Sequence, residues 1–429
     1  MSNESPRESA MMAMASFLAA PRFVTALTTV IVGTGTLAFL LRQTIGWAGL
    51  IAILATVAVL GSVSIVARWG TIQWRGLLPV SLLLFLGWAS LSFNWSQYHW
   101  ATVGGLAYLG VFTLLGIYVA LTRDTIQIVR AFGDTLRFML ALSLAIEIVS
   151  GVLSDSSNRV LHVLGKLDEL GPIQGITGAH NQLGILALVA LITFGTELRT
   201  HLTSRGLSIG SMSLAGIVLL LTRSPLAWGA LLVVGIAAAA LYGLRRVARD
   251  RQRFWQIGML IATPLVGILA WTFRSGIVTL FNAGGELAYR LELWRQTWDL
   301  IRLFPLQGWG WVGIWRRDLP PFQAFASMSA REGSSASNAF LDVWLQLGLI
   351  GLVLFVVLVG LALVRSWLLA SRQRSIVFAW PALVLAALVT TALAESSLLF
   401  EFGWFTFVVC CVKAAEQLSW RRAFDLTER

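Results

Sequence analysis

Charged residues are scarce in this chain of 429 residues. Only 12% of the residues are charged and 57% are hydrophobic, whereas a soluble protein of this length would carry about a quarter charged residues. The chain has two cysteines, the neighbours Cys410 and Cys411, a number and spacing that exclude a disulfide framework and a cysteine zinc site. Its four histidines are scattered, and it has no Walker or Rossmann glycine motif. Nucleotide and metal chemistry are therefore poorly supported.

Long apolar runs make up most of what is present. They recur at about 18 to 25 residues, the length that a helix needs to cross the hydrocarbon of a bilayer. We expect an all-α membrane protein with about twelve transmembrane helices, near residues 23–41, 47–66, 76–93, 100–121, 133–151, 180–196, 208–222, 225–243, 255–273, 339–364, 375–392 and 402–418. We expect no cleavable signal peptide, because the first apolar run is long enough to span.

The basic residues are concentrated in every second connection between these apolar runs. If the N-terminus is cytoplasmic, most of the 32 lysines and arginines fall in the tails and the inner connections. The short outer connections then hold only Arg42, Arg159, Lys166 and Arg223. The positive-inside rule thus predicts that both termini are cytoplasmic and that the one long loop is outside. The net charge of +11 reflects this orientation, and we expect no nucleic-acid partner.

This topology divides the chain into five parts. They are a cytoplasmic N-terminal tail (1–22), nine transmembrane helices (23–273), a large extracytoplasmic loop (274–338), three further transmembrane helices (339–418) and a cytoplasmic C-terminal tail (419–429). The first outer turn, residues 42–46, has no acidic pair. Many lipid-linked sugar transferases keep a catalytic acid there, so this argues against that class.

The long loop is expected to contain an amphipathic helix that ends before Pro305. The expected apolar face carries Leu287, Leu291, Trp294, Trp298 and Ile301, and the expected polar face carries Arg295, Gln296, Asp299 and Arg302. Such a helix lies on the membrane interface or caps the bundle. Beyond it, Trp309 and Trp311 are typical of interfacial anchors.

Arginines on the outer side, one between two apolar runs and two on the loop helix, are candidates for binding a pyrophosphate. Arg223, Arg290 and Arg295 would offer bidentate donors that never deprotonate. Each also has a plain structural interpretation: Arg223 could reach the lipid headgroups, and Arg295 could form a solvated pair with Glu292. His180 could act in catalysis or could cap a helix together with Asn181, since both stand at the start of an apolar run.

Two carboxylates lie in or beside the apolar runs. An ionisable residue in a transmembrane helix is costly and is a functional candidate by default. Glu147 and Glu395 could therefore be coupling or gating groups of a transporter for a lipid-linked sugar or a small amphiphile. Glu395 could instead be only an interfacial residue, because it stands near an outer helix end.

From about residue 175 to 410 the chain resembles the O-antigen ligase and polymerase family, which includes exopolysaccharide polymerases. The resemblance rests on short segments in a fixed order around the long loop. They are Gly178–Gly184, Leu221–Ser224, Arg290 with Trp294, Pro305 with Gly308–Gly310, Asn338 with Leu341, Gly348 and Gly351, and Glu395–Leu398.

The resemblance implies a metal-independent, cofactor-free, inverting glycosyltransferase of the bacterial inner membrane. It would transfer a glycan from an undecaprenyl-pyrophosphate donor to a glycan or lipid acceptor, among membrane lipids and other polysaccharide-assembly proteins. Polymerase and ligase both fit. By match, Arg290 binds the pyrophosphate, with Arg223 as a less close match, and Asn181, Arg295 and Asn338 are further substrate-binding candidates.

One position departs from the family pattern. The resemblance implies a basic histidine beside Asn338, where this chain has Ser337. A serine cannot act as a general base near neutral pH, so His180 or Glu332 becomes the candidate base. The departure also leaves open a non-catalytic partner in an envelope polysaccharide system, alongside the transporter.

Overall fold

The computed structural model describes residues 16–70, 79–150, 171–247, 284–325 and 335–417, apart from Arg317 and Arg374, together with the single residues 251, 254 and 258. Across these residues the chain is helical and has no β-strand. The helices are α2 (Pro21–Ala67), α3 (Val80–Leu91), α4 (His99–Thr122), α5 (Thr125–Ile148), α6 (His180–Thr200), α7 (Arg205–Leu221), α8 (Pro225–Arg246), α11 (Gly284–Ile301), α12 (Ala339–Arg372), α13 (Ala379–Ala392) and α14 (Glu401–Gln417).

Each expected span overlaps a described helix except the one at 255–273, of which only residue 258 is described. Five described helices, α2, α4, α6, α8 and α12, are long and apolar enough to cross a membrane. Shorter apolar helices cover Val80–Asn94, Arg205–Leu221 and Ile376–Ala392. The all-helical fold is confirmed for the described residues, with five helices that could cross a membrane. The number of twelve spans remains a prediction.

Two of the long helices are each a pair of helices joined at a glycine. α2 breaks at Gly46, with φ 71°, and α12 breaks at Gly348, with φ 68°. Both angles lie in the left-handed region that glycine adopts without a steric penalty. The break at Gly46 falls in the turn that the sequence predicts between its first two spans.

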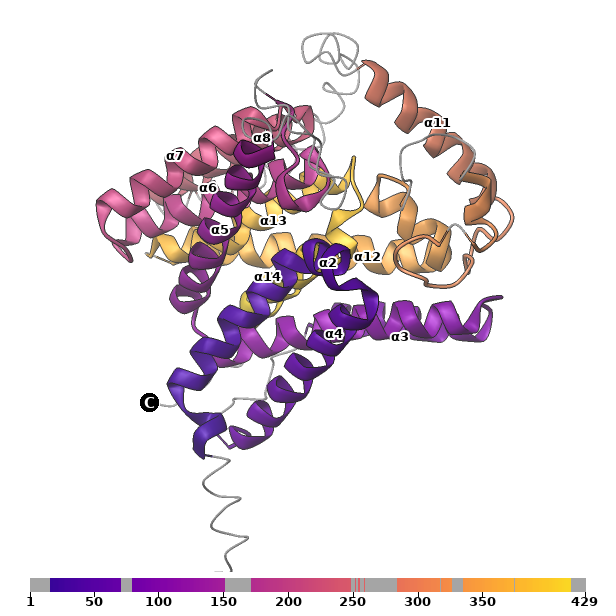
Figure 1. Ribbon diagram of the computed structural model, residues 1–429, viewed down its shortest axis with the longest axis horizontal. Helices are drawn as coiled ribbons and strands as arrows, with labels where there is room; N and C mark the ends of the chain where they lie inside the picture. Colours follow the sequence, from indigo (N-terminus) through magenta and orange to yellow (C-terminus); the bar gives the residue numbers. More distant parts are fainter. Residues whose placement is uncertain are drawn as a thin grey trace, which may run out of the picture.

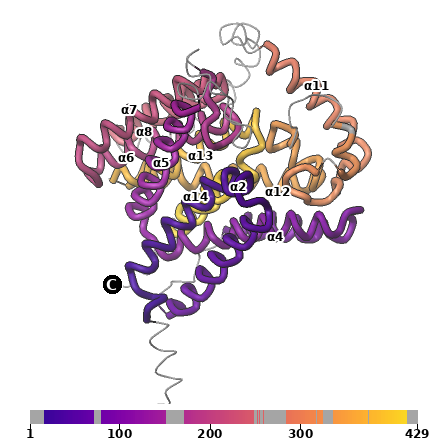
Figure 2. The backbone as a smooth tube through the Cα atoms, viewed as in Figure 1, coloured from indigo at the N-terminus to yellow at the C-terminus, as the bar shows by residue number. Residues whose placement is uncertain are grey.

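The two ends of the chain pack against each other. α14, in yellow, lies against α2 and α4, in indigo and purple (Figures 1 and 2). α6 contacts α5, α7, α8 and α13, and α12 contacts α3, α13, α14 and α11. Figure 1 shows α6, α7 and α8 gathered on one side of the molecule and α11 on the other.

The loop after α11 is built into the bundle at the break in α12. The backbone N–H groups of Trp309 and Gly310 donate to the carbonyls of Leu345 and Gln346, at 3.0 and 2.8 Å. The break frees these carbonyls from the helical pattern, so the loop satisfies groups that would otherwise be unpaired. A Cβ on Gly348 would collide with the carbonyl of Leu306. The loop and the helix therefore meet backbone to backbone.

This docking corrects one expectation about the tryptophans. Trp311 is 1% exposed and its ring meets Phe85 edge to face, with the ring centroids 6.3 Å apart. Trp311 is a core residue and not an interfacial anchor. The hydrogen bonds from residues 309 and 310 to α12 place the residues that follow inside the bundle. Trp309 is half-buried and donates its indole N–H to the carbonyl of Leu300.

The loop helix α11 exists as predicted, but a different face is buried. Its buried line is Leu293, Thr297 and Ile301, whereas Leu291 and Trp298 are 43% and 38% exposed. The reason is that the loop supplies its own apolar partners. Leu293 and Ile301 share a small core with loop residues such as Val312, Trp315, Phe322 and Phe325. Arg290 and Glu286 lie on the same side of α11, one and two turns before Leu293.

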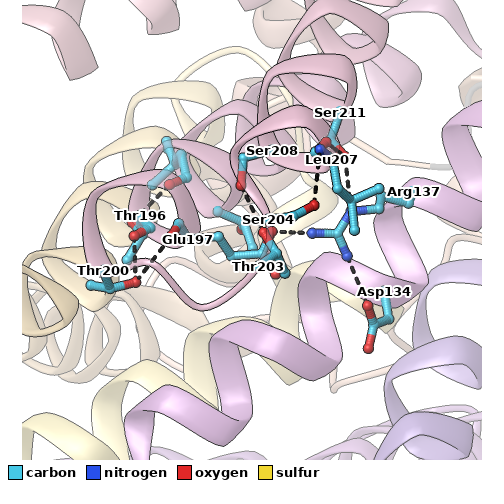
Figure 3. A network of polar contacts seen from close by, with 12 residues as sticks. Asp134, Arg137, Thr196, Glu197, Thr200, Thr203, Ser204, Leu207, Ser208 and Ser211 are labelled. Atoms are coloured by element: carbon cyan, nitrogen blue, oxygen red, sulfur yellow. Dashed lines mark hydrogen bonds and ion pairs between the residues drawn. The ribbon is translucent and has the colours of Figure 1, made fainter.

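A buried ion pair joins three helices near the other end of α6. The Arg137 guanidinium, on α5, contacts the Glu197 carboxylate on α6 and donates to Asp134 Oδ1 and to Ser211 Oγ on α7, at 2.7 and 2.8 Å (Figure 3). The side chain of Glu197 is 0% exposed and that of Arg137 is 14% exposed. Since Glu197 is seventeen residues beyond His180, the pair lies about 25 Å along the helix from its start.

Candidate functional site

The polar residues singled out in the sequence converge on Glu395, in the turn between α13 and the short helix η6 (Ser397–Leu399). Glu395 Oε1 accepts a hydrogen bond from Asn181 Nδ2 at 3.0 Å and one from Arg290 Nη2 at 2.9 Å. The side chains of Arg290 and Glu395 are 13% and 18% exposed. A carboxylate of an inter-helix turn thus joins the start of α6 to the loop helix.

Asn181 is held from its other side by the start of α8. Ser224 Oγ donates to Asn181 Oδ1 at 2.6 Å, and Ser224 also caps α8 by accepting from the Ala227 N–H. Ser224 is 0% exposed and Asn181 is 7% exposed. Arg223 directly precedes this cap, with φ 47° and an exposed side chain. The short connection from α7 to α8 therefore places Arg223 next to the cluster around Glu395.

The loop helix adds a second acid to the cluster. Glu286 lies one turn before Arg290, with Oε2 3.7 Å from Arg290 Nη2. Its other oxygen, Oε1, is 3.4 Å from His180 Nε2. His180 is the first residue of α6 and its side chain is 25% exposed. A carboxylate beside one ring nitrogen of a histidine fixes the tautomer and orients the ring.

Glu147 fixes the chain just before His180. Its Oε1 accepts from the backbone N–H groups of Gln174 and Gly175, at 2.8 Å each. These residues open the short helix η3 (Gly175–Thr177), which leads through Gly178 to the start of α6. Glu147 is 0% exposed. The structure therefore gives this buried acid the role of holding the backbone just before His180.

Asn338 flanks the Glu395 turn from the far end of the loop. Its Oδ1 caps α12 by accepting from Phe340 and Leu341, and its Nδ2 donates to the carbonyl of Leu393 at 3.0 Å. Its backbone N–H donates to Ser396 Oγ at 3.2 Å. Asn338 thus ties the start of α12 to both sides of the turn. Ser337, half-buried with φ 48°, directly precedes it.

Two carboxylates share one guanidinium in this cluster. Arg290 lies between Glu286 and Glu395, 3.7 Å from Glu286 Oε2 and 2.9 Å from Glu395 Oε1. Burial raises the pKa of Glu395 above its usual value, and Glu286 raises it further, while Arg290 and the hydrogen bond from Asn181 lower it. Glu395 is therefore a carboxyl group that takes up a proton readily when another anion approaches.

The structure does not bring Arg295 into this cluster. Arg295 points outward from α11 and forms a two-point pair with Glu292, at 3.0 and 2.7 Å, with 67% of its side chain exposed. The reason is that five residues turn a helix by about 500°, so Arg295 faces away from Arg290. Glu332 lies outside the described residues. His99 begins α4 and stacks edge to face on Phe93, at 4.8 Å between centroids.

Glu286 is the residue that sequence reasoning missed. It stands four residues before Arg290, the spacing of a helical ion pair, and this spacing was the available signal. Glu395 was recognised as unusual, but nothing in its local sequence indicated that three distant segments would meet on it.

A comparison with known protein families matches the part of the chain that holds several residues of this cluster. Residues 210–356 match a protein-family model described as O-antigen ligase. The match includes Arg223, Ser224, Arg290 and Asn338, and it ends before Glu395. No curated protein matches the chain.

Proposed function

Because the chain belongs to the O-antigen ligase and polymerase family, we propose that it is a glycosyltransferase that polymerises or ligates glycans. The donor is an undecaprenyl-pyrophosphate glycan, the transfer is inverting and needs no metal, and the site faces outward from the bacterial cytoplasmic membrane. Twelve spans with both termini in the cytoplasm give this orientation. The convergence of Asn181, Arg290 and Asn338 on the Glu395 turn is the observation that supports the proposal.

Arg290 and Arg223 bind the donor pyrophosphate in this proposal. In the unliganded protein Arg290 is held by Glu395, so the pyrophosphate competes with a carboxylate. The incoming negative charge raises the pKa of Glu395 further, and the protonated carboxyl no longer holds the guanidinium as an ion. Arg290 can then turn its donors to the phosphates, where fixed positive charge stabilises the leaving group as it departs.

His180 acts as the general base. Its Nε2 faces Glu286 at 3.4 Å, so Nε2 carries the proton and Nδ1 is the free acceptor. The acceptor hydroxyl oxygen attacks the anomeric carbon and the bond from that carbon to the pyrophosphate oxygen breaks. The hydroxyl proton passes to Nδ1, and Glu286 stabilises the resulting imidazolium as in other carboxylate–histidine pairs. Asn181 and Asn338 position the Glu395 turn.

Reconstitution of the wild type and of two arginine variants, Arg290→Ala and Arg295→Ala, tests the proposal. The protein is placed in liposomes with a labelled undecaprenyl-pyrophosphate oligosaccharide, and the products are followed over time. We expect longer or transferred glycan with release of the isoprenoid pyrophosphate. Arg290→Ala should abolish this release, and Arg295→Ala, five residues along the same helix on its exposed side, should retain it.

The transporter and the assembly partner predict a different result. Both leave the donor chemically unchanged, and a transporter moves it between leaflets. Intact donor in the presence of wild-type protein, together with polymer made by the native membranes, would therefore rule out the transferase.

A further inference from the structure

An exposed apolar surface passes from the loop onto α12. Leu303 and Leu306, in the turn after α11, are 61% and 60% exposed. Leu349 and Ile350, directly after the break in α12, are 39% and 43% exposed. The two segments meet, because the backbone N–H of Leu349 donates to the carbonyl of Pro305 at 2.9 Å. We refer to the side chains of Leu303, Leu306, Leu349 and Ile350 as the leucine surface.

The exposed face of α11 continues the leucine surface. Leu291 and Trp298 are both exposed, and their separation of seven residues puts them on one face of the helix. The ring of Trp298 meets that of Trp344 edge to face, with 5.0 Å between the centroids. Trp344 Nε1 in turn donates to the carbonyl of Pro305 at 3.2 Å. The apolar surface therefore extends from α11 through this turn to α12, against which α11 packs (Figure 1).

The part of α12 beyond the break indicates the depth of the leucine surface. α12 is long and apolar enough to cross a membrane. Its run from Leu349 to Val364 contains no polar side chain and covers about 24 Å of helix, and Arg365 follows it. Since the hydrocarbon of a bilayer is about 30 Å thick, the whole run is needed to cross it. Leu349 and Ile350 therefore belong at one edge of the hydrocarbon.

Tryptophans gather around the same break. Trp88 Nε1 donates to the carbonyl of Leu347 at 2.9 Å, and Trp95 Nε1 donates to that of Gln307 at 3.0 Å. The two rings are 5.1 Å apart between centroids. With Trp344, three indole N–H groups thus bond to carbonyls of the break or of the turn beside it. Tryptophan concentrates where a membrane meets water, because its ring is apolar and its N–H is polar. Their position also puts the break at the membrane surface.

We propose that the leucine surface and the exposed face of α11 insert into the phospholipid leaflet on the loop side of the membrane. Phospholipid fits this surface because it continues directly onto the exposed apolar side of a membrane-crossing helix. Arg302, whose guanidinium lies 5.9 Å from the centroid of the Trp298 ring, can reach the headgroup phosphates from there.

This contact has a consequence for the candidate site. α11 lies along the membrane surface and holds Arg290, the neighbour of Leu291, at the level of the headgroups. The pyrophosphate of a lipid-linked donor lies at that level. Only this consequence rests on the proposed function, and the membrane contact itself does not.

Spin labels on single cysteines test the membrane contact without turnover. The two native cysteines are buried and are first replaced by alanine. Leu303→Cys, Leu306→Cys or Arg295→Cys is then added and labelled, and the protein is placed in vesicles of phosphatidylethanolamine and phosphatidylglycerol. Collisions of the label with oxygen, which concentrates in hydrocarbon, are compared with collisions with a nickel chelate, which stays in water. The ratio of oxygen to nickel collisions should be severalfold higher at positions 303 and 306 than at 295, the control on the polar face of α11.

Other surroundings of this surface give different results. If it lies in water, the nickel collision rate at 303 and 306 equals that at 295. If a second copy of the chain covers it, the labels are shielded from both reagents and broaden each other's spectra. Either result would overturn the proposal. The three labelled side chains are exposed in the structure, so the labels displace no buried contact, and an unchanged melting temperature confirms this.

Kinetics test the consequence for Arg290 and keep the two proposals apart. The double variant Leu303→Gln, Leu306→Gln should raise the KM for the lipid-linked donor severalfold at an unchanged melting temperature, because the loosened α11 no longer holds Arg290 at the headgroups. An unchanged donor KM would reject this positioning. Labels in hydrocarbon without any release of isoprenoid pyrophosphate would keep the membrane contact and reject the transferase. Release by a protein whose labels lie in water would reject the membrane contact and keep the transferase.

Discussion

Removing Arg290 should have two separable effects, one on stability and one on turnover. In Arg290→Ala the carboxylate of Glu395 keeps its burial and its hydrogen bond from Asn181 but loses its counter-ion. Breaking a buried ion pair from one side costs about 3–5 kcal/mol. The two side chains are 13% and 18% exposed, so we expect the lower end, about 3 kcal/mol.

This loss should be visible as a shift in melting temperature. For a chain longer than 250 residues, each kcal/mol corresponds to about 2 °C or less, so Arg290→Ala should melt about 5 °C below the wild type. The measurement is size-exclusion chromatography of detergent-solubilised protein after heating. Arg295→Ala is the control, since its pair with Glu292 is exposed and such pairs contribute little to stability.

The double variant Arg290→Gln, Glu395→Gln separates the two effects. It removes both charges and leaves neutral groups that can still hydrogen-bond, so it should recover most of the lost melting temperature. Turnover should stay at least about 100-fold below wild type, because no guanidinium remains to stabilise the leaving pyrophosphate. If turnover recovered together with the melting temperature, Arg290 would be only a structural partner of Glu395, and the proposed pyrophosphate role would be refuted.

The stability defect should also depend on pH. Burial already raises the pKa of Glu395 above the usual 4.5, and Arg290 lowers it, so Arg290→Ala raises it further. A folded carboxyl with a raised pKa binds its proton more tightly than the unfolded chain does, and the protein loses stability as the pH rises through that pKa. The difference in melting temperature between Arg290→Ala and the wild type should therefore become smaller as the pH falls from neutral toward 4.5.

Three further variants test how neighbouring residues hold the site. Glu147→Gln keeps an acceptor for the N–H groups of Gln174 and Gly175 and should retain turnover within about threefold, whereas Glu147→Ala should lose about 2 kcal/mol; loss of function in both would favour a proton-coupled role. Ser224→Ala and Ser204→Ala each remove a helix cap worth about 1 kcal/mol, but only Ser224→Ala should also lower turnover, because Ser224 holds Asn181. Gly348→Ala places a side chain on a backbone with φ 68° and ψ −173°, at a cost of about 1–3 kcal/mol, and adds a collision with Leu306; it should make the loop sensitive to protease, and unchanged cleavage would contradict the docking described above.

The sequence alone indicated the apolar helices and the break at Gly46, because length and composition decide whether a segment can span a bilayer. It also indicated candidate polar residues, since Asn181 and Asn338 stand at the starts of apolar runs and Arg290 lies on the predicted loop helix. It did not indicate that they meet on Glu395, because a contact between residues 214 positions apart leaves no trace in local spacing.

The buried face of α11 shows the same limit more sharply. Spacing correctly predicted a helix ending near Ile301, and it favoured the stripe through Leu291 and Trp298 as the buried one. The loop covers the helix with Trp315 and Phe322 instead, so the line with Leu293 turns inward and carries Arg290 and Glu286 to the site. Which face docks depends on the partner, and here the partner is a loop whose only regular element at this contact is the short 3₁₀ helix Phe322–Phe325.

The ion pair between Arg137 and Glu197 has a consequence for biogenesis. α5 is not among the helices apolar enough to cross a membrane by themselves. Its central Arg137 pairs within the helix only with the exposed Asp134, and a charged residue at the centre of a membrane helix costs about 2.5–3.5 kcal/mol on insertion. During synthesis α5 emerges before α6, which carries the compensating acid. A nascent chain that ends before residue 180 should therefore keep α5 at the translocon or at the membrane surface. The two helices should enter the bilayer as a hairpin, and the His180 end of α6 would cross with them.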